Sequence, residues 1–226
     1  MNVLTEAVIR LKLKGENPDA VNEYKVEPGT IVTPSARDFL ASHKISLVYD
    51  EKLKDKKVKP EHMTSIRGAE LVNKDHPIIR FRGKIDSLEA RILETQLAFQ
   101  KMGMDKAVMD LGNVLEYVHE ILRCEVLDRT LDDQILLGMD GDEIRARSHT
   151  PKKYYGVNHI AVNLEHGEGV ILLNSLRTQA REVELTAYDT FKDEYGIPKR
   201  PDIIRGLNRL SSLFYAMMFK VLTKEY

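Results

Sequence analysis

The sequence predicts a mainly α-helical protein, built as an antiparallel four-helix bundle with a small N-terminal α/β module. Two observations lead to this fold class. Between residues 78 and 221, four segments carry apolar side chains at alternating spacings of three and four, whereas residues 1–50 show short, mixed patterns. Each long segment has a single apolar stripe, which an isolated helix would leave exposed to water. Four such helices bury their stripes most simply against one another.

The N-terminal module has clear local signals. Thr33 followed by Pro34 is typical of an N-cap and a first helical turn, so TPSARDFLASHK is expected to form a helix. The next residues, ISLVYD, alternate in polarity as a strand does. EKLKDKKVKP, at 51–60, is a charged run closed by a proline, which indicates a linker or an exposed loop. We therefore expect the module and its linker in residues 1–60 and the helical bundle in residues 61–226.

Start and stop signals support the four long helices. Asp75 and Pro77 are typical of a helix start, and Gly103 separates the first helix from the second. The fourth helix is expected to begin after Pro201. In chain order the four stripes are Ile78, Phe81, Ile85, Leu88, Ile92, Thr95, Phe99, Met102; Met104, Val108, Leu111, Leu115, Val118, Leu122; Leu173, Leu176, Ala180, Val183, Ala187; and Ile203, Leu207, Leu210, Phe214, Met217, Val221.

An insertion at about 127–167 interrupts this pattern between the second and third helices. Asp140 is expected to cap a short helix, GDEIRARS, which a stretch rich in Gly, His, Lys and Tyr follows. Long irregular connections in compact domains are uncommon and are often functional loops. Two readings stay open here, a binding loop and a plain crossover connection.

Composition narrows the function classes. The net charge of −1 gives no field that would favour nucleic acid or an anionic membrane as a partner. The single cysteine, Cys124, excludes an intramolecular disulfide and is consistent with a reducing compartment. No apolar run approaches the roughly 20 residues of a spanning helix, and the charged N-terminus does not resemble a secretory signal. We expect a soluble, cytoplasmic protein.

Polar residues beside the apolar stripes are the candidate site. Arg177, Arg181 and Glu184 are spaced i, i+4 and i+7, so they share one face of the third helix. Arg82 and Asp86 flank the first stripe, and an Asp86–Arg177 bridge would give that buried guanidinium a partner. Asn208 lies beside the fourth stripe. The face fits an anion site, because guanidinium groups match phosphate oxygens. From spacing alone, an interhelical polar network that fixes helix register is favoured over the anion site.

Known catalytic motifs are absent from the sequence. It contains no HExxH, Walker A or GxGxxG pattern, and its seven histidines lack metal-ligand spacing. Glu116 and His119 form a single Glu-x-x-His pair, whereas a di-iron bundle needs two such pairs. No metal site in the protein itself is expected.

Several segments, taken in order, resemble the ATP:cob(I)alamin adenosyltransferases, most closely the ethanolamine-utilisation type. They are TPSARDFLASHKISLVYDE, HMTSIRGAELV, LVNKDHPIIRFRGKIDSLEARILETQ, RSHTPKKYYGV, LLNSLRTQAREVE and RPDIIRGLNRLSSLFYAMM, and they cover roughly residues 30–50 and 62–222. The family carries Arg-x3-Arg-x2-Glu and Asn-Arg-Leu-Ser elements on its last two long helices, which match Arg177, Arg181, Glu184 and Asn208 here. The resemblance implies a ferritin-like bundle in which Arg181, Glu184 and Asn208 contact ATP. It also implies that Arg177 bridges an acid on the first helix, for which Asp86 is the candidate.

The sequence departs from the family in several places. Glu182 follows Arg181 where a second arginine is usual, and Ser212 stands in place of an acid. The Thr/Gly-rich loop that cradles triphosphate in the propanediol-utilisation type has no match in residues 1–50. Some ethanolamine-type enzymes hold a divalent metal in a cysteine cluster, which is missing between His62 and His76. Candidates for phosphate binding are therefore Arg82 and Lys84, with Lys74, Arg80, Lys152 and Lys153 as further possibilities.

The activity implied is transfer of the 5′-deoxyadenosyl group from ATP to the cobalt of cob(I)alamin, with Mg²⁺ accompanying the ATP. A corrinoid without its lower axial ligand needs a bulky apolar side chain and excluded water beneath it; Tyr154, Tyr155 or Phe81 are candidates, with ordinary aromatic packing as the alternative. Family members place ATP between subunits, so a homo-oligomer, in particular a trimer, is expected. A B12-dependent lyase or a microcompartment shell is a possible partner. Two other functions stay open, a non-enzymatic corrinoid carrier and a purely structural ferritin-like bundle.

Overall fold

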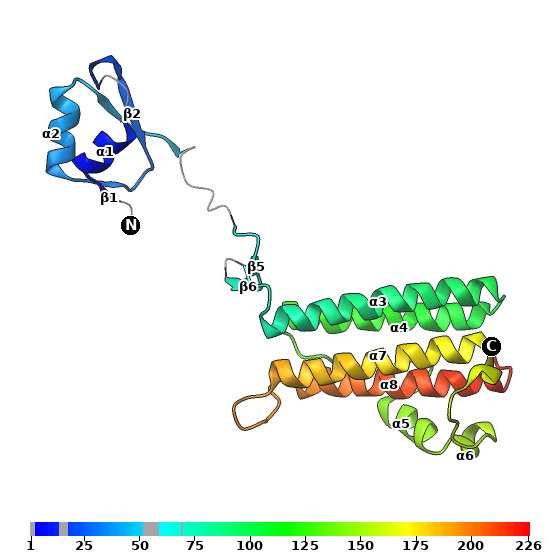
Figure 1. Ribbon diagram of the computed structural model, residues 1–226. Helices are drawn as coiled ribbons and strands as arrows, with labels where there is room; N and C mark the ends of the chain where they lie inside the picture. The colour runs from blue at the N-terminus through cyan, green and yellow to red at the C-terminus, as the bar shows by residue number, and fades with distance from the viewer. Residues whose placement is uncertain (1–2, 14–17, 52–58, 69) are drawn as a thin grey trace. The chain divides into compact units, whose positions relative to one another are not determined.

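The computed structural model describes residues 3–13, 18–51, 59–68 and 70–226. The chain divides into two compact units, Met1–Glu61 and His62–Tyr226, each with its own core. Figure 1 gives the helices and strands of both. Most of the expected linker falls on residues 52–58, which lie outside the described residues.

The first unit is an α/β module, as predicted. Two pairs of parallel strands accompany its helices, β1 with β3 and β2 with β4. Thr33 caps the second helix by accepting the Ala36 N–H at 3.3 Å, which confirms the predicted cap. In chain order the elements are β1 (Val3–Leu4), α1 (Glu6–Lys12), η1 (Pro18–Ala20), β2 (Glu23–Val26), β3 (Ile31–Val32), α2 (Pro34–Ser42) and β4 (Ser46–Tyr49).

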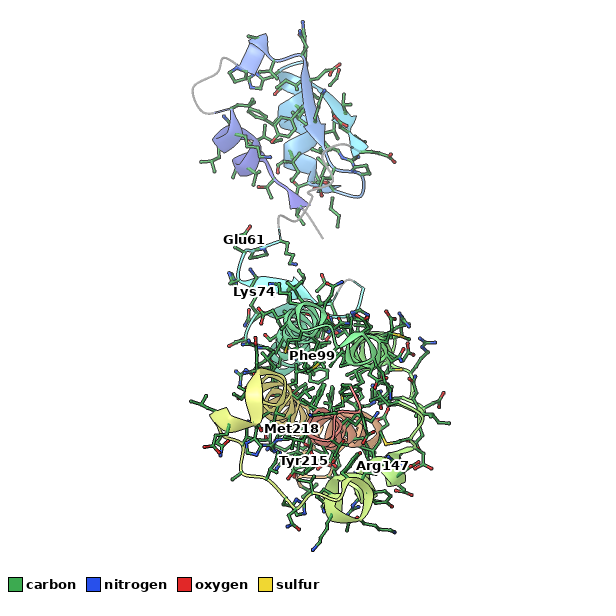
Figure 2. The ribbon with its side chains drawn as sticks, turned by 90° about the vertical axis from the view of Figure 1, so that its right-hand side faces the viewer. Glu61, Lys74, Phe99, Arg147, Tyr215 and Met218 are labelled. Carbon is green, nitrogen blue, oxygen red and sulfur yellow. The ribbon has the colours of Figure 1, made fainter. Side chains whose placement is uncertain are left out.

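The second unit is the four-helix bundle that the stripes predict. A short antiparallel hairpin precedes it, formed by β5 (Met63–Ser65) and β6 (Leu71–Asn73). The four long helices are α3 (Pro77–Lys101), α4 (Asp105–Val126), α7 (Gly167–Phe191) and α8 (Pro201–Leu222). α3 packs on α4 and α7, and α8 packs on α7 and α4, so that every neighbouring pair is antiparallel (Figure 1). Their predicted stripes form the core, where Phe99 lies fully buried between the helices (Figure 2).

The buried face of α4 differs from the sequence pattern. In α4 the expected stripe residues Val108, Leu115 and Leu122 are only half-buried, whereas Val114 and Ile121 are fully buried. Because α4 contacts both α3 and α8, its buried face is broader than one stripe and is centred on the adjacent row.

None of the helices in the described ranges is both long and apolar enough to span a bilayer.

The insertion is a crossover that runs the length of the bundle. α4 and α7 point in the same direction, so the chain must return from the end of one to the start of the other (Figure 1). On the way it forms α5 (Gly141–His149), α6 (Pro151–Tyr155) and the turn η3 (Leu164–His166). Asp140 caps α5 by accepting the N–H groups of the next turn, as predicted. Both α5 and α6 pack on α8.

Candidate functional site

Asn208 on α8 links the two helices that carry the candidate residues. Its side-chain amide donates to Glu184 Oε1 on α7 at 2.8 Å, and its Oδ1 accepts Arg209 Nη1 at 3.0 Å. All three side chains are half-buried. Because the amide both donates and accepts, these partners fix its orientation. The structure thus brings Glu184 and Asn208 together across the seam between α7 and α8.

Arg177 lies on the same face of α7 but has other partners than the sequence suggested. Its Nε and Nη2 donate to Asn174 Oδ1 at 3.1 and 3.0 Å, and its guanidinium lies 5.8 Å from the centre of the Tyr215 ring. The predicted bridge from Arg177 to Asp86 within one chain is therefore wrong. The guanidinium turns towards α8, whereas Asp86 is an exposed residue of α3 that makes no hydrogen bond or ion pair with any described residue.

Arg181 is one turn further along α7 and is exposed. Within the described ranges no carboxylate pairs with it, so its five N–H groups are available to a ligand. Its neighbour Glu182 accepts Lys84 Nζ from α3 at 3.2 Å, with side-chain exposures of 63% and 43%. Ion pairs this exposed are weak. A phosphate group can therefore compete with Glu182 for the Lys84 ammonium.

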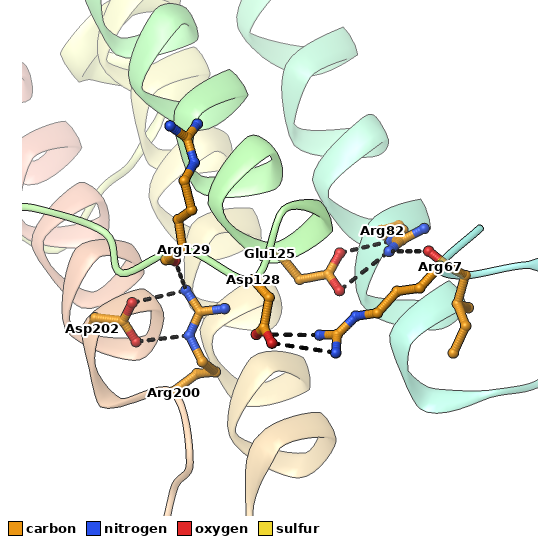
Figure 3. A network of polar contacts seen from close by, with 8 residues as sticks. Arg67, Arg82, Glu125, Asp128, Arg129, Arg200 and Asp202 are labelled. Carbon is orange, nitrogen blue, oxygen red and sulfur yellow. Dashed lines mark hydrogen bonds and ion pairs between the residues drawn. The ribbon is translucent and has the colours of Figure 1, made fainter. Parts of the chain in front are cut away.

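Arg82 also differs from the prediction, because its guanidinium already has partners within the chain. Nε and Nη2 donate to the two oxygens of Glu125 at 2.7 and 3.2 Å, and Nη2 also donates to the Ile66 carbonyl at 3.2 Å (Figure 3). Glu125 is 1% exposed, so the loss of Arg82 would leave its carboxylate buried without a cationic partner. Arg82 thus joins the β5–β6 hairpin to α3 and α4, and its assignment to ATP does not hold.

A sequence signal for Glu125 existed. It is the next position of the second apolar stripe, three residues after Leu122, and an acid there needs a buried cation. A second network lies at the same end of the bundle (Figure 3). Arg200 pairs with Asp202 at 2.8 Å and donates to the Arg129 carbonyl at 2.7 Å. The other role of Asp202 is to accept the Leu131 N–H at 2.9 Å, which holds the start of the crossover to α8.

The three aromatic candidates for the corrinoid occupy different surroundings. Phe81 is fully buried and packs edge-on to Phe191, with ring centres 5.2 Å apart, so it belongs to the core and cannot lie beneath a corrinoid. Tyr155 is nearly buried and stacks on Phe219 at 5.4 Å, and burial raises its pKa. Tyr154 is 37% exposed, with the Arg147 guanidinium 5.3 Å from its ring.

A hollow of about 440 Å³ lies beside α6 on the crossover. Its walls include Lys152 and Lys153, two of the candidates for phosphate binding, as well as His149 and His159. A different environment surrounds His119 on α4, which lies 3.8 Å from Glu89 and 3.9 Å from Glu116. Among the described residues, no group of three or more His, Cys, Asp and Glu side chains is arranged to hold a metal ion.

Comparisons with known proteins find matches over most of the chain. The family model described as cobalamin adenosyltransferase matches residues 56–221. Two curated relatives, both named corrinoid adenosyltransferase EutT, come from Escherichia coli K12 and Salmonella typhimurium and are 31% and 32% identical over 167 residues. Each match covers 74% of this chain and 61% of the relative's length. No solved structure matches the chain significantly.

Proposed function

The chain belongs to the cobalamin adenosyltransferase family, and on that premise we propose that it transfers the 5′-deoxyadenosyl group of ATP to the cobalt of cob(I)alamin. The products are adenosylcobalamin and triphosphate. The observation that carries the proposal is the polar face at the α7–α8 seam. There Arg181, which pairs with no carboxylate of the described residues, lies one turn from Arg177 and on the same face as the linked Glu184–Asn208 pair, in the order of the family's elements.

The chemistry makes one bond and breaks another. The cobalt–C5′ bond forms as the C5′–O bond breaks, and the triphosphate leaves with the electron pair. Because negative charge gathers on the leaving oxygen, cationic groups aimed at it lower the barrier. Arg181 and Arg177 supply that charge in the proposal, with Lys84 as a further contact to phosphate. No side chain needs to act as a base, since Co(I) is a nucleophile without losing a proton.

Glu184 and Asn208 act on the nucleoside in this proposal. A carboxylate and an amide that are already hydrogen-bonded to each other present fixed acceptors and donors to ribose hydroxyls or to the base. We propose that Mg²⁺ arrives with the triphosphate. Exhaustive chelation should abolish turnover and Mg²⁺ alone should restore it, whereas a strict need for Zn²⁺ or Fe²⁺ would contradict this part of the proposal.

We also propose a homotrimer with the nucleotide between subunits. Asp86 and Arg177 do not meet within one chain, yet Asp86 lacks a partner among the described residues and Arg177 keeps N–H groups unused. The proposed arrangement joins Asp86 of one subunit to Arg177 of the next.

Mixed oligomers test this arrangement directly. Asp86→Ala and Arg177→Ala chains should each be inactive alone. Co-expressed, they should regain part of the activity, because one kind of junction then contains both native residues. A mixture that stays as inactive as its components would refute the shared site.

The activity itself is tested with protein, Mg-ATP and chemically reduced cobalamin, by following the corrinoid spectrum and triphosphate release. Arg181→Ala should raise KM for ATP and lower kcat with an unchanged melting temperature. Arg123→Ala, an exposed arginine on the outer face of α4, is the matched control and should behave as wild type. Adenosylcobalamin binding without triphosphate release would identify a carrier instead, and full activity of Arg181→Ala would remove the proposed ATP site.

The remaining proposals concern context. The resemblance to the ethanolamine-utilisation type suggests that the coenzyme serves a B12-dependent lyase. Tyr154 is our candidate for the face beneath the corrinoid, because it alone of the three aromatic candidates is substantially exposed. We also propose that the protein acts near a bacterial microcompartment.

A further inference from the structure

Tyr215 on α8 connects the crossover to the candidate site. One face of its ring carries the Arg177 guanidinium at 5.8 Å, within the range of a cation–π contact. Its hydroxyl accepts the Ile160 N–H at 3.3 Å and meets His159 Nδ1 at 3.1 Å. The rings of His159 and Tyr215 are nearly parallel, at 13°, with centres 6.0 Å apart. Phe219 packs edge-on to the Tyr215 ring at 4.9 Å.

With a neutral His159 ring, the hydrogen-bond partners determine the direction of each bond. His159 Nε2 lies 3.1 Å from the His149 carbonyl oxygen, which can only accept, so Nε2 carries the proton. In the neutral ring Nδ1 is then an acceptor. The Tyr215 hydroxyl therefore donates to His159 while its oxygen accepts the Ile160 N–H. Its rotation is fixed by one partner on each side.

Arg177 gains its direction from this arrangement. Asn174 Oδ1 accepts Nε–H and one Nη2–H, and the guanidinium carbon lies over the Tyr215 ring, 5.8 Å from its centre. Three of its five N–H groups then remain for a ligand or a partner carboxylate. A tilt of the ring would turn all three, and small misplacements of such groups reduce rates strongly.

We propose that His159 is a positioning residue, which acts through the Tyr215 hydroxyl to aim Arg177 at its ligand. It touches neither ATP nor the corrinoid in this scheme. The inference rests on the proposed function only in placing Arg177 at the ATP site. The crossover thereby gains a role that neither of the sequence-based readings specified, because its His159 holds Tyr215 of α8 in place.

Variants that separate the hydrogen bond from the ring test this proposal. His159→Phe keeps a stacked ring and removes the acceptor, Tyr215→Phe keeps the ring beneath Arg177, and His159→Asn restores an acceptor near the Nδ1 position. Both Phe variants remove the bond between Tyr215 and His159; Tyr215→Phe also removes the acceptor of the Ile160 N–H, and His159→Phe removes the donor to the His149 carbonyl. Each should lower kcat/KM for ATP by about five- to ten-fold, the size of effect expected for the shared bond. The double variant should lose no more than either single one, and His159→Asn should recover most of the loss. His166→Phe is the control, because its Nδ1 accepts only a local N–H, that of Asn163.

A measurement without substrate separates this inference from the proposed function. The Arg177 Nε–H resonance, assigned by its loss in Arg177→Lys, should shift in His159→Phe and Tyr215→Phe but stay in place in His166→Phe. If the wild-type protein shows no turnover, the proposed function fails while these shifts still decide the positioning role. Unshifted resonances, or losses that multiply in the double variant, would overturn it.

Discussion

Glu125→Gln is the most informative single change in the bundle. Glu125 is 1% exposed and Arg82 is 19% exposed, and their side chains meet at 2.7 Å. Glutamine has nearly the same shape, so the substitution changes charge and hydrogen bonding with little change in packing. Its amide group would face the guanidinium with one donor too many. Arg82 would keep the glutamine oxygen and the Ile66 carbonyl, at 3.2 Å, as acceptors, but it would lose its charged partner.

The expected cost follows from the burial of the pair. Removing one partner of a buried ion pair costs about 3–5 kcal/mol, because the other charge stays buried. Arg82 retains some exposure and two uncharged acceptors, so the lower end, about 3 kcal/mol, applies. The nearby pair of Arg67 and Asp128 is 47% and 65% exposed, and such pairs contribute less than about 1 kcal/mol. The two pairs should therefore differ clearly.

Urea unfolding of the whole protein, followed by circular dichroism at 222 nm, measures the difference. Asp128→Asn is the matched control at the same end of the bundle. The double variant Arg82→Met with Glu125→Met should recover most of the loss, because it leaves no charge unpaired. A Glu125→Gln protein within about 1 kcal/mol of wild type, or an equal effect of Asp128→Asn, would show that this pair does not stabilise the bundle.

Three further outcomes are expected. Gly206→Ala should destabilise by about 1–3 kcal/mol, because its new Cβ would lie 2.6 Å from the Tyr117 hydroxyl and 2.9 Å from Leu131; adding Tyr117→Phe should recover part of this in thermal melts. Glu89→Gln should raise the melting temperature at pH 7, because the Glu89 pKa is raised. Burial is the main cause, His119 lowers the pKa in part, and Asp86 raises it further. A raised carboxyl pKa contributes stability at low pH that is lost as pH rises through it, so the benefit should vanish near pH 4, and a constant benefit would contradict it. The ultraviolet titration of Tyr117 should have its midpoint near pH 12, because burial raises its pKa to about 12.

The long helices could be predicted from sequence because their signals are redundant. Pro77 and Gly103 bracket the first one, and the apolar period repeats over many turns, so both boundaries and type were correct. The buried face of α4 could not be read as reliably. Apolar residues flank its stripe on both sides, and only the two neighbouring helices decide which row faces inward. The β5–β6 hairpin, with strands of three residues, gives almost no periodic signal.

The candidate site was predictable as a face but not as a set of bonds. Spacing alone places Arg177, Arg181 and Glu184 on one side of α7. It cannot choose the partner of an arginine, because the long side chain reaches several acceptors and its neighbours decide between them. Arg177 thus turns to Asn174, and Arg82 to a glutamate 43 residues away.

The route of the crossover determines which of its positions can tolerate sequence changes. Both of its ends are pinned by the bundle, while α5 and α6 lie on the outside of α8 (Figure 1). The segment also contributes Leu131, Leu136, Met139 and Ile144 to the core of the four helices. Changes that leave the bundle intact are therefore restricted to exposed crossover positions such as Leu164.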